Sequence, residues 1–380
     1  MARAHLPRHR WEPRRRLLAA VIVLVAATVW ATIAHISQAA TGAGAPAGTG
    51  AQPSAEMPAA LAAAALIPND QGPDPECRRS RPPARCHAPT GDPAAADYVD
   101  IRSVAPNARD RRANAAGSAG TFVSVCGRNL NGHRNPDNFI VAPGVFNGAH
   151  HTHDYVGNLS ADGNSTDESL EAAGTTCRRD DRSTYYWPVL RLRGTTGSDA
   201  EADGGGKDGN VGRILTPASV RLEFRGNRFA KVAEMPRFLR LIMGDAKAVT
   251  NGPANARAQW TCTGFTNRRT TKYPLCPRGS QVQRILDFPS CWDGVNTDSP
   301  NHRAHVIFPA ADGRCAEGTT PIAQLRMTLT YSVPRGRSFA LDTFPEQNHN
   351  PLTDHADFAN VMPAQLITQL TDCINRGRRC

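Results

Sequence analysis

Two segments of the sequence concentrate side chains that can act as acids, bases or metal ligands. Residues 149–158 (AHHTHDYVGN) contain three histidines within four positions, followed directly by an aspartate and a tyrosine. Residues 287–309 (DFPSCWDGVNTDSPNHRAHVIFP) combine a cysteine and a tryptophan with aspartates, asparagines and two histidines. Imidazole and carboxylate groups are common proton donors and acceptors in enzymes. We therefore predict that the two segments form walls of one polar site.

The spacing of the first histidines suits a metal ion as well as a substrate. If this segment is a strand, its side chains alternate between two faces, so His151 and His153 point the same way. A third ligand has to come from elsewhere, and the candidates are His302, His305 and His355. Three imidazoles suit zinc or copper. We assign His151, His153 and His305 as the ligands of any metal, although the sequence requires no cofactor.

A catalytic interpretation uses many of the same residues. Histidine assisted by aspartate or tyrosine can serve as the acid or base of hydrolysis or of β-elimination. The structural alternatives are a hydrogen-bond network of the histidines, a turn at Asp293-Gly294, and a core position for the tyrosines. The candidate catalytic residues are His151, His153, Asp154, Asp298, His302 and His305. The candidate substrate-binding residues are Tyr155, Tyr186, Asp293, Asn296, His355 and Asp357.

Four motifs follow one another along the chain: residues 151–158 (HTHDYVGN), 183–188 (STYYWP), 288–305 (FPSCWDGVNTDSPNHRAH) and 355–360 (HADFAN). In this order they resemble the secreted family catalogued as domain of unknown function 1996, over roughly residues 121–376. The resemblance implies a disulfide-bonded domain, found in fungi and actinobacteria, with no generally established activity. It also implies that the polar residues of the motifs form the site, namely His151, His153, Asp293, Asn296, Asp298, His302, His305, His355 and Asp357.

The apolar pattern predicts the scaffold that must position these residues. Short apolar runs bounded by Gly, Pro, Asn and Asp recur from residue 121 onward, without alternation of strands and helices. The clearest run, residues 324–333, alternates apolar and polar positions as a half-buried strand does. We predict a mainly β domain, an antiparallel sandwich or jelly roll with long loops. Leu366, Leu370 and Ile374 recur at helical spacing and predict one C-terminal α-helix.

The N-terminal part of the chain has the features of an export segment and a linker. Residues 1–39 hold six arginines and an uncharged apolar run, which predicts either a cleaved signal peptide or a signal-anchor that stays as a transmembrane helix. Residues 40–120 are rich in Ala, Gly and Pro, which predicts a flexible linker and places the globular domain at 121–380. About half of the net charge of +10 lies in residues 1–39, so the charge does not indicate a nucleic-acid partner.

The cysteines indicate an oxidising compartment. An exported chain with ten cysteines predicts five disulfides, and Cys77–Cys86 and Cys373–Cys380 would close short loops. We expect an extracellular protein, secreted or tethered by its N-terminal segment, which is its only expected contact with a membrane.

The features together lead to three expectations about function. The first is a carbohydrate-active protein that cleaves a polysaccharide, as a hydrolase or a lyase, through the polar cleft. The second is a non-catalytic module that binds a cell-wall glycan. The third is a metal-binding extracellular protein. In the first two, the expected partner is a polysaccharide or cell-wall glycan.

Overall fold

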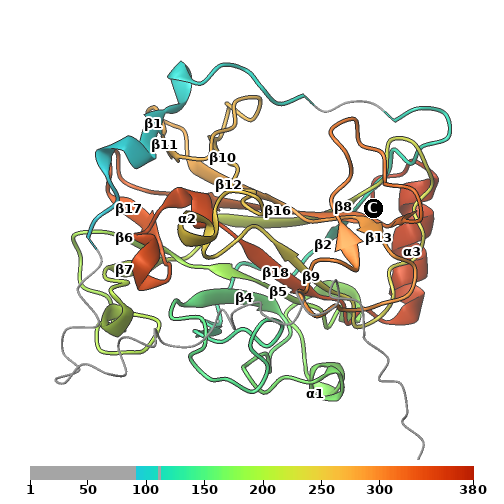
Figure 1. Ribbon diagram of the computed structural model, residues 1–380, viewed down its shortest axis with the longest axis horizontal. Coiled ribbons are helices and arrows are strands. Elements are labelled where there is room, and N and C mark those ends of the chain that lie inside the picture. Colours follow the sequence, from blue (N-terminus) through green and yellow to red (C-terminus); the bar gives the residue numbers. More distant parts are fainter. Residues whose placement is uncertain (1–90, 110–112) are drawn as a thin grey trace, which may run out of the picture. The chain divides into compact units, whose positions relative to one another are not determined.

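The computed structural model describes residues 91–109 and 113–380, which are mainly strands joined by long loops (Figure 1). Two five-stranded antiparallel sheets form the framework. The first has the order β10 (Trp260–Cys262), β12 (Val282–Asp287), β16 (Gln324–Tyr331), β8 (Ser219–Arg225) and β2 (Thr121–Ser124). The second has the order β3 (Arg134–Asn135), β4 (His153–Gly157), β5 (Thr184–Pro188), β18 (Ala356–Ala359) and β9 (Arg240–Met243).

Smaller elements complete the fold. A parallel pair joins β1 (Tyr98–Asp100) and β11 (Tyr273–Leu275). Two three-stranded sheets have the orders β14 (Val306–Ile307), β13 (Cys291–Trp292), β15 (Thr320–Pro321), and β17 (Phe339–Leu341), β6 (Leu190–Leu192), β7 (Arg213–Leu215). The α-helices are α1 (Asp167–Ala172), α2 (Ala248–Asn251) and α3 (Ala364–Asn375). The predictions of a mainly β domain and of a C-terminal helix are confirmed, while the sandwich or jelly-roll assignment stays a prediction.

The two five-stranded sheets share one hydrophobic core. Strand β16 buries Leu325, Met327 and Leu329 on one face, as its alternating pattern predicts. Side chains from the other sheet meet this layer: the rings of Phe224 on β8 and Phe358 on β18 have centroids 6.0 Å apart. Helix α3 closes one end beside β2 (Figure 1). Its buried residues include Leu366, Leu370 and Ile374, the three positions that predict the helix.

The second sheet is covered on both faces. Alternate residues of β4, β5 and β18 point into the shared core, among them Val156, Tyr185 and Phe358. The residues between them, which include Tyr155 and Tyr186, point the other way into a smaller second core. All five residues of β4 are therefore buried, and polar groups on the second face are shielded from water.

The globular part begins earlier than residue 121. Strand β1 lies within the predicted linker, yet it pairs with β11, and Tyr98 is buried in the main core with its hydroxyl donating to the Phe339 carbonyl at 2.6 Å. The predicted boundary misses this short strand because the composition of residues 40–120 does not show it, and its partner lies 175 positions further along the chain.

Four disulfides join described cysteines: Cys126–Cys177, Cys262–Cys276, Cys291–Cys315 and Cys373–Cys380. The local Cys373–Cys380 pair is confirmed, whereas Cys77 and Cys86 lie outside the described residues. No helix within residues 91–109 and 113–380 combines the length and apolarity needed to cross a bilayer. The apolar run of the predicted signal segment lies outside these ranges.

Candidate metal centre

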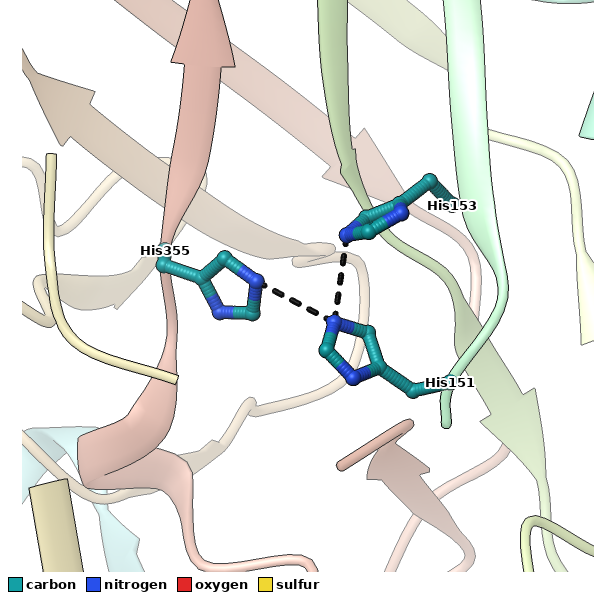
Figure 2. Close-up of side chains that lie close together, drawn as sticks. All are labelled: His151, His153 and His355. Atoms are coloured by element: carbon teal, nitrogen blue, oxygen red, sulfur yellow. Dashed lines mark hydrogen bonds between the residues drawn. The ribbon is translucent and has the colours of Figure 1, made fainter. Parts of the chain in front are cut away.

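Three histidines converge on the second face of the β3-β4-β5-β18-β9 sheet. His153 is the first residue of β4, His151 lies two positions earlier, and His355 directly precedes β18. Strands β4 and β18 both pair with β5, so they lie about 10 Å apart. The imidazoles of His153 and His355 point toward each other across this space, and His151 reaches in beside them (Figure 2).

The ligand atoms of the three rings lie at metal-site spacing. His151 Nε2 is 3.1 Å from His153 Nε2 and 3.2 Å from His355 Nε2 (Figure 2). The ligand atoms that the three residues offer all lie within 4.8 Å of one another, and all three side chains are buried. A tetrahedral zinc ion with bonds of about 2.0–2.1 Å separates its ligand nitrogens by about 3.3 Å. The two short separations therefore need little change to hold an ion.

Backbone carbonyls fix the protonation of two of the rings. His153 Nδ1 lies 3.0 Å from the Asp137 carbonyl oxygen, and His355 Nδ1 lies 2.8 Å from that of Thr353. A carbonyl only accepts hydrogen bonds, so each Nδ1 carries the proton and donates it. Each neutral ring then presents the lone pair of Nε2 to the centre of the cluster. This arrangement orients histidine ligands in metal proteins.

The electrostatic surroundings keep the rings neutral. Burial lowers the pKa of His151 and of His153 well below the usual value, and the neighbouring imidazoles lower it further. Burial lowers the pKa of His355 to about 4, with the positive charge of Arg284 acting in the same direction. Neutral imidazole is the form that binds metals. The three rings are therefore neutral at neutral pH, which is the form that can bind a metal cation.

A small cavity lies beside the histidines. It has a volume of about 70 Å³, and the side chains around it include His151, His355, Asp357, Arg303 and Phe344. Burial raises the pKa of Asp357 to about 7, against the opposing influence of Arg303 and of a hydrogen bond from Asn138. Asp357 Oδ1 is buried and accepts no hydrogen bond from any described residue. The cavity has room for about two waters at about 30 Å³ each.

The structure corrects the predicted metal set. His355 completes the cluster with His151 and His153, whereas His305 donates from Nε2 to the Arg240 carbonyl on β9 at 2.7 Å. His305 therefore bonds the edge strand β9, which lies beyond β18 in the sheet. His150 also turns away, because its backbone is in the left-handed region (φ 51°) and its Nδ1 lies 3.1 Å from Asp208.

Three candidates from residues 149–158 and 183–188 have structural roles. Asp154 points to the opposite face from His153, and its buried carboxylate pairs with the partly exposed Arg134 at 2.7 Å. Tyr155 and Tyr186 are stacked, with ring centroids 4.9 Å apart, and both are fully buried. Because these groups are engaged in the interior, Asp154 is not a catalytic group at the cluster, and the two tyrosines do not offer a surface for a substrate.

The candidates from residues 287–309 form hydrogen bonds that stabilise their own loop. Asp298 accepts from His302 Nδ1 at 2.9 Å, and Ser299 Oγ lies 3.0 Å from His305 Nδ1. Asp293 accepts from the Asn296 backbone and side chain, so it makes the turn that was the structural alternative. These residues form a second group of hydrogen bonds, and the three histidines that lie within 4.8 Å of one another include neither His302 nor His305.

Sequence reasoning missed most of the polar lining of the cavity, which also includes Asn138, Asp245, Lys247 and Arg303. Asn138 bonds Asp357 and accepts from the Tyr186 hydroxyl at 2.8 Å, although it lies outside both polar segments. Arg303 lies between the predicted histidines His302 and His305, and it is the side chain of that stretch that reaches the cavity. No spacing pattern singles out either residue, because both reach the cavity through the tertiary fold.

A second group of metal-ligand types does not qualify as a site. Cys126, Cys177 and Asp181 also lie close together, but the two cysteines form a disulfide and offer no thiolate.

The comparison with protein families identifies the domain. The model of the family described as Domain of unknown function (DUF1996) matches residues 138–361, which is more than half of the chain and includes all three histidines of the cluster. Neither the curated proteins nor the solved structures contain a match to the chain. The resemblance of the four ordered motifs is thereby confirmed. The chain belongs to the DUF1996 family.

Proposed function

We propose that this protein is an extracellular transition-metal protein that holds one ion through Nε2 of His151, His153 and His355. The observation that carries the proposal is the convergence of three buried, neutral imidazoles with Nε2 atoms 3.1 and 3.2 Å apart. Lone pairs at this distance repel unless a proton or a cation lies between them. The described disulfides support an oxidising compartment outside the cell.

Zinc and copper fit the ligand set best. Imidazole nitrogen suits both ions, whereas calcium and magnesium prefer oxygen. Three protein ligands leave a coordination position open, as in catalytic rather than structural zinc sites. The cavity beside His151 and His355 gives a small ligand such as water access to that position. A bound ion would act there as a Lewis acid and lower the pKa of a bound water toward about 7.

The alternative occupant of the cluster is a proton. His151 Nε2–H could be shared between the lone pairs of His153 and His355, which would make the cluster a structural hydrogen-bond network. The two arrangements differ in their response to metal. A proton-bridged trio is complete without an ion, whereas a metal site takes up an ion with high affinity and a fixed stoichiometry.

Metal content and affinity test the proposal. Chelator-treated protein should bind about one zinc or copper ion per chain in titration calorimetry, and elemental analysis after desalting should find the ion retained. His153→Asn and His355→Asn keep a donor near the position of Nδ1 but remove Nε2, so they should abolish this binding. His302→Ala removes a histidine of the second group of hydrogen bonds and should bind like the wild type. Wild-type protein without stoichiometric uptake of either metal refutes the proposal.

Polysaccharide cleavage and glycan binding at this cavity are weaker candidates. Sites that enclose organic ligands usually measure about 300–1,000 Å³. The cavity at the histidines, at about 70 Å³, suits an ion with its waters better than a sugar ring.

A further inference from the structure

One carboxyl group beside the three histidines has an oxygen without a hydrogen-bond partner. Asp357 lies on β18, is fully buried, and lines the cavity that His151 and His355 also line. Its Oδ2 accepts a hydrogen bond from Asn138 Nδ2 at 3.3 Å, but its Oδ1 accepts none from the described residues. A buried acceptor without a partner costs free energy, and most such atoms in proteins are paired. The unpaired oxygen therefore indicates that a small molecule binds in the cavity.

The strand places this carboxyl group next to a metal ligand. Ala356 and Phe358 point into the main core, so His355 and Asp357 point together to the opposite face. Residues two positions apart in a strand are separated by roughly 7 Å. A water bound to an ion at about 2.1 Å, donating a hydrogen bond of about 2.7 Å, spans up to about 5 Å. The spacing therefore suits a molecule that contacts both the ion and Asp357.

Asp357 is placed to contact such a molecule rather than the ion itself. In the part of the chain that the structure describes, the ligand atoms within 4.8 Å of one another include those of the three histidines but not the carboxylate of Asp357. A group that lies outside the set of ligands but lines the same cavity can hold whatever occupies the open coordination position.

A chain of hydrogen bonds fixes the orientation of the carboxyl group. Asn138 Oδ1 accepts from the Ile140 and Val141 backbone amides, both at 3.1 Å. It also accepts from the Tyr186 hydroxyl at 2.8 Å. These donors determine which end of the Asn138 amide is the oxygen, so the Nδ2 group is the one that faces Asp357 Oδ2. The carboxyl group is thus held by Oδ2, and Oδ1 remains as an acceptor.

We propose that Asp357 Oδ1 accepts a hydrogen bond from the ligand at the open position of the metal ion, so that the centre selects small protic oxygen ligands such as water, hydroxide or hydroperoxide. The inference rests on the proposed function, because it requires an ion at the three histidines. Fluoride has about the size and the charge of hydroxide but carries no proton. It would turn lone pairs toward Oδ1 and leave that oxygen unpaired, so the centre should discriminate against it.

A water that fills the cavity without contacting the ion is the alternative. The cavity of about 70 Å³ has room for about two waters, and either could donate to Oδ1. In that case Asp357 would have no influence on what the ion binds. The two cases differ in the effect of Asp357 on the affinity of the ion for fluoride.

Fluoride binding to the copper(II)-loaded full chain tests the inference. Electron paramagnetic resonance detects fluoride on copper(II), because the fluorine nucleus splits the copper signal. Asp357→Asn should bind fluoride at least about tenfold more tightly than the wild type at the same pH, because Asn138 would orient the new amide with its N–H group toward the ligand. The proteins are compared at full copper occupancy, established by elemental analysis. If the chain takes up zinc but not copper, cobalt(II) and its visible absorption replace copper(II).

Asp245→Asn is the matched control. Asp245 also lines the cavity, so the substitution removes the same charge from the same surroundings. Its oxygens already accept from the Lys247 backbone amide at 2.8 Å and from Asn251 Nδ2 at 3.3 Å. The control should therefore act through charge alone and raise the fluoride affinity several-fold less than Asp357→Asn does.

Two outcomes would overturn this inference and leave the metal centre standing. One is a metal-loaded wild type that binds fluoride as tightly as Asp357→Asn, and the other is an equal gain in Asp245→Asn. A chain that takes up no metal overturns the proposed function and this inference with it. If Asp357→Asn does not melt like the wild type, Asp357→Ser takes its place, since its hydroxyl can also donate to fluoride, and an affinity equal to that of the wild type contradicts the proposal.

Discussion

A metal ion bound at His151, His153 and His355 should raise the thermal stability of the chain. The perturbation is the addition of zinc or copper to chelator-treated protein. The Nε2 separations of 3.1 and 3.2 Å are within about 0.2 Å of the tetrahedral value of about 3.3 Å. His151 is thus already at ligand distance from both other rings, and an ion that binds the three nitrogens stabilises the folded state that presents them together.

The size of this effect follows from linkage. An ion at 100 times its dissociation constant stabilises a folded chain by about 2.7 kcal/mol. For a folded unit of this size, 1 kcal/mol corresponds to roughly 2 °C in melting temperature. The expected increase on adding metal is therefore about 5 °C, measured by scanning calorimetry at the metal concentration that titration has defined.

Histidine variants distinguish metal binding at the three histidines from other effects of metal on the melting temperature. In His153→Asn and His355→Asn, the addition of metal should no longer raise the melting temperature, whatever the melting temperature of the metal-free variant. His302→Ala should keep the full increment, because that ring bonds Asp298 in the second group of hydrogen bonds. An increment below about 1 °C in the wild type, or one that survives in either asparagine variant, would refute the reasoning.

Three further predictions address the framework. Arg284→Met leaves the carboxylate of Asp354 buried without its 2.5 Å partner and should cost about 3–5 kcal/mol in denaturant unfolding, so a loss under 1 kcal/mol contradicts it. Burial lowers the pKa of His349 to about 4, while the unfolded chain takes up a proton below about pH 6.5. His349 alone should therefore contribute a fall of about 3 kcal/mol in stability as pH falls from 6.5 to 4, and His349→Asn should remove that contribution from the slope. Phe358→Ala empties a position between the two sheets and should cost about 3–5 kcal/mol, with no change in metal stoichiometry.

Local patterns predicted the parts of the fold that depend on local spacing. The alternation in β16 and the helical spacing in α3 are both confirmed, because one face of each element is buried. The period of two also predicted correctly that the rings of His151 and His153 lie on the same side of the strand, close to each other. Strand β1 was missed because its burial depends on a partner far along the chain.

The identity of the third histidine could not be read from local spacing. His305 and His355 follow His153 at long separations, and both precede or begin short strands. The strand order decides between them: β18 pairs with β5, the neighbour of β4, whereas His305 bonds the edge strand β9. Order within a sheet is a property of tertiary packing, so a single sequence contains no direct sign of it.

Two buried ion pairs hold the backbone on which the histidines stand. Between His151 and His153, the Thr152 amide donates to Asp342, and Asp342 is paired with the buried Arg191 at 2.6 Å. Directly before His355, Asp354 is paired with Arg284 at 2.5 Å, and both side chains are fully buried.

The two ion pairs are better explained by the positioning of the histidine segments than by a contribution to folding stability. Buried ion pairs are often no more stabilising than apolar residues of similar volume. Arg284 also donates to the Pro188 carbonyl at 2.7 Å, and Pro188 pairs with His153, so one guanidinium joins the segments of two of the three histidines. A metal site needs its ligands held within about 0.5 Å. Arg284→Met should therefore weaken metal affinity even under conditions where the variant is fully folded. An affinity equal to that of the wild type in the folded variant would show that the ion pair does not position the histidines.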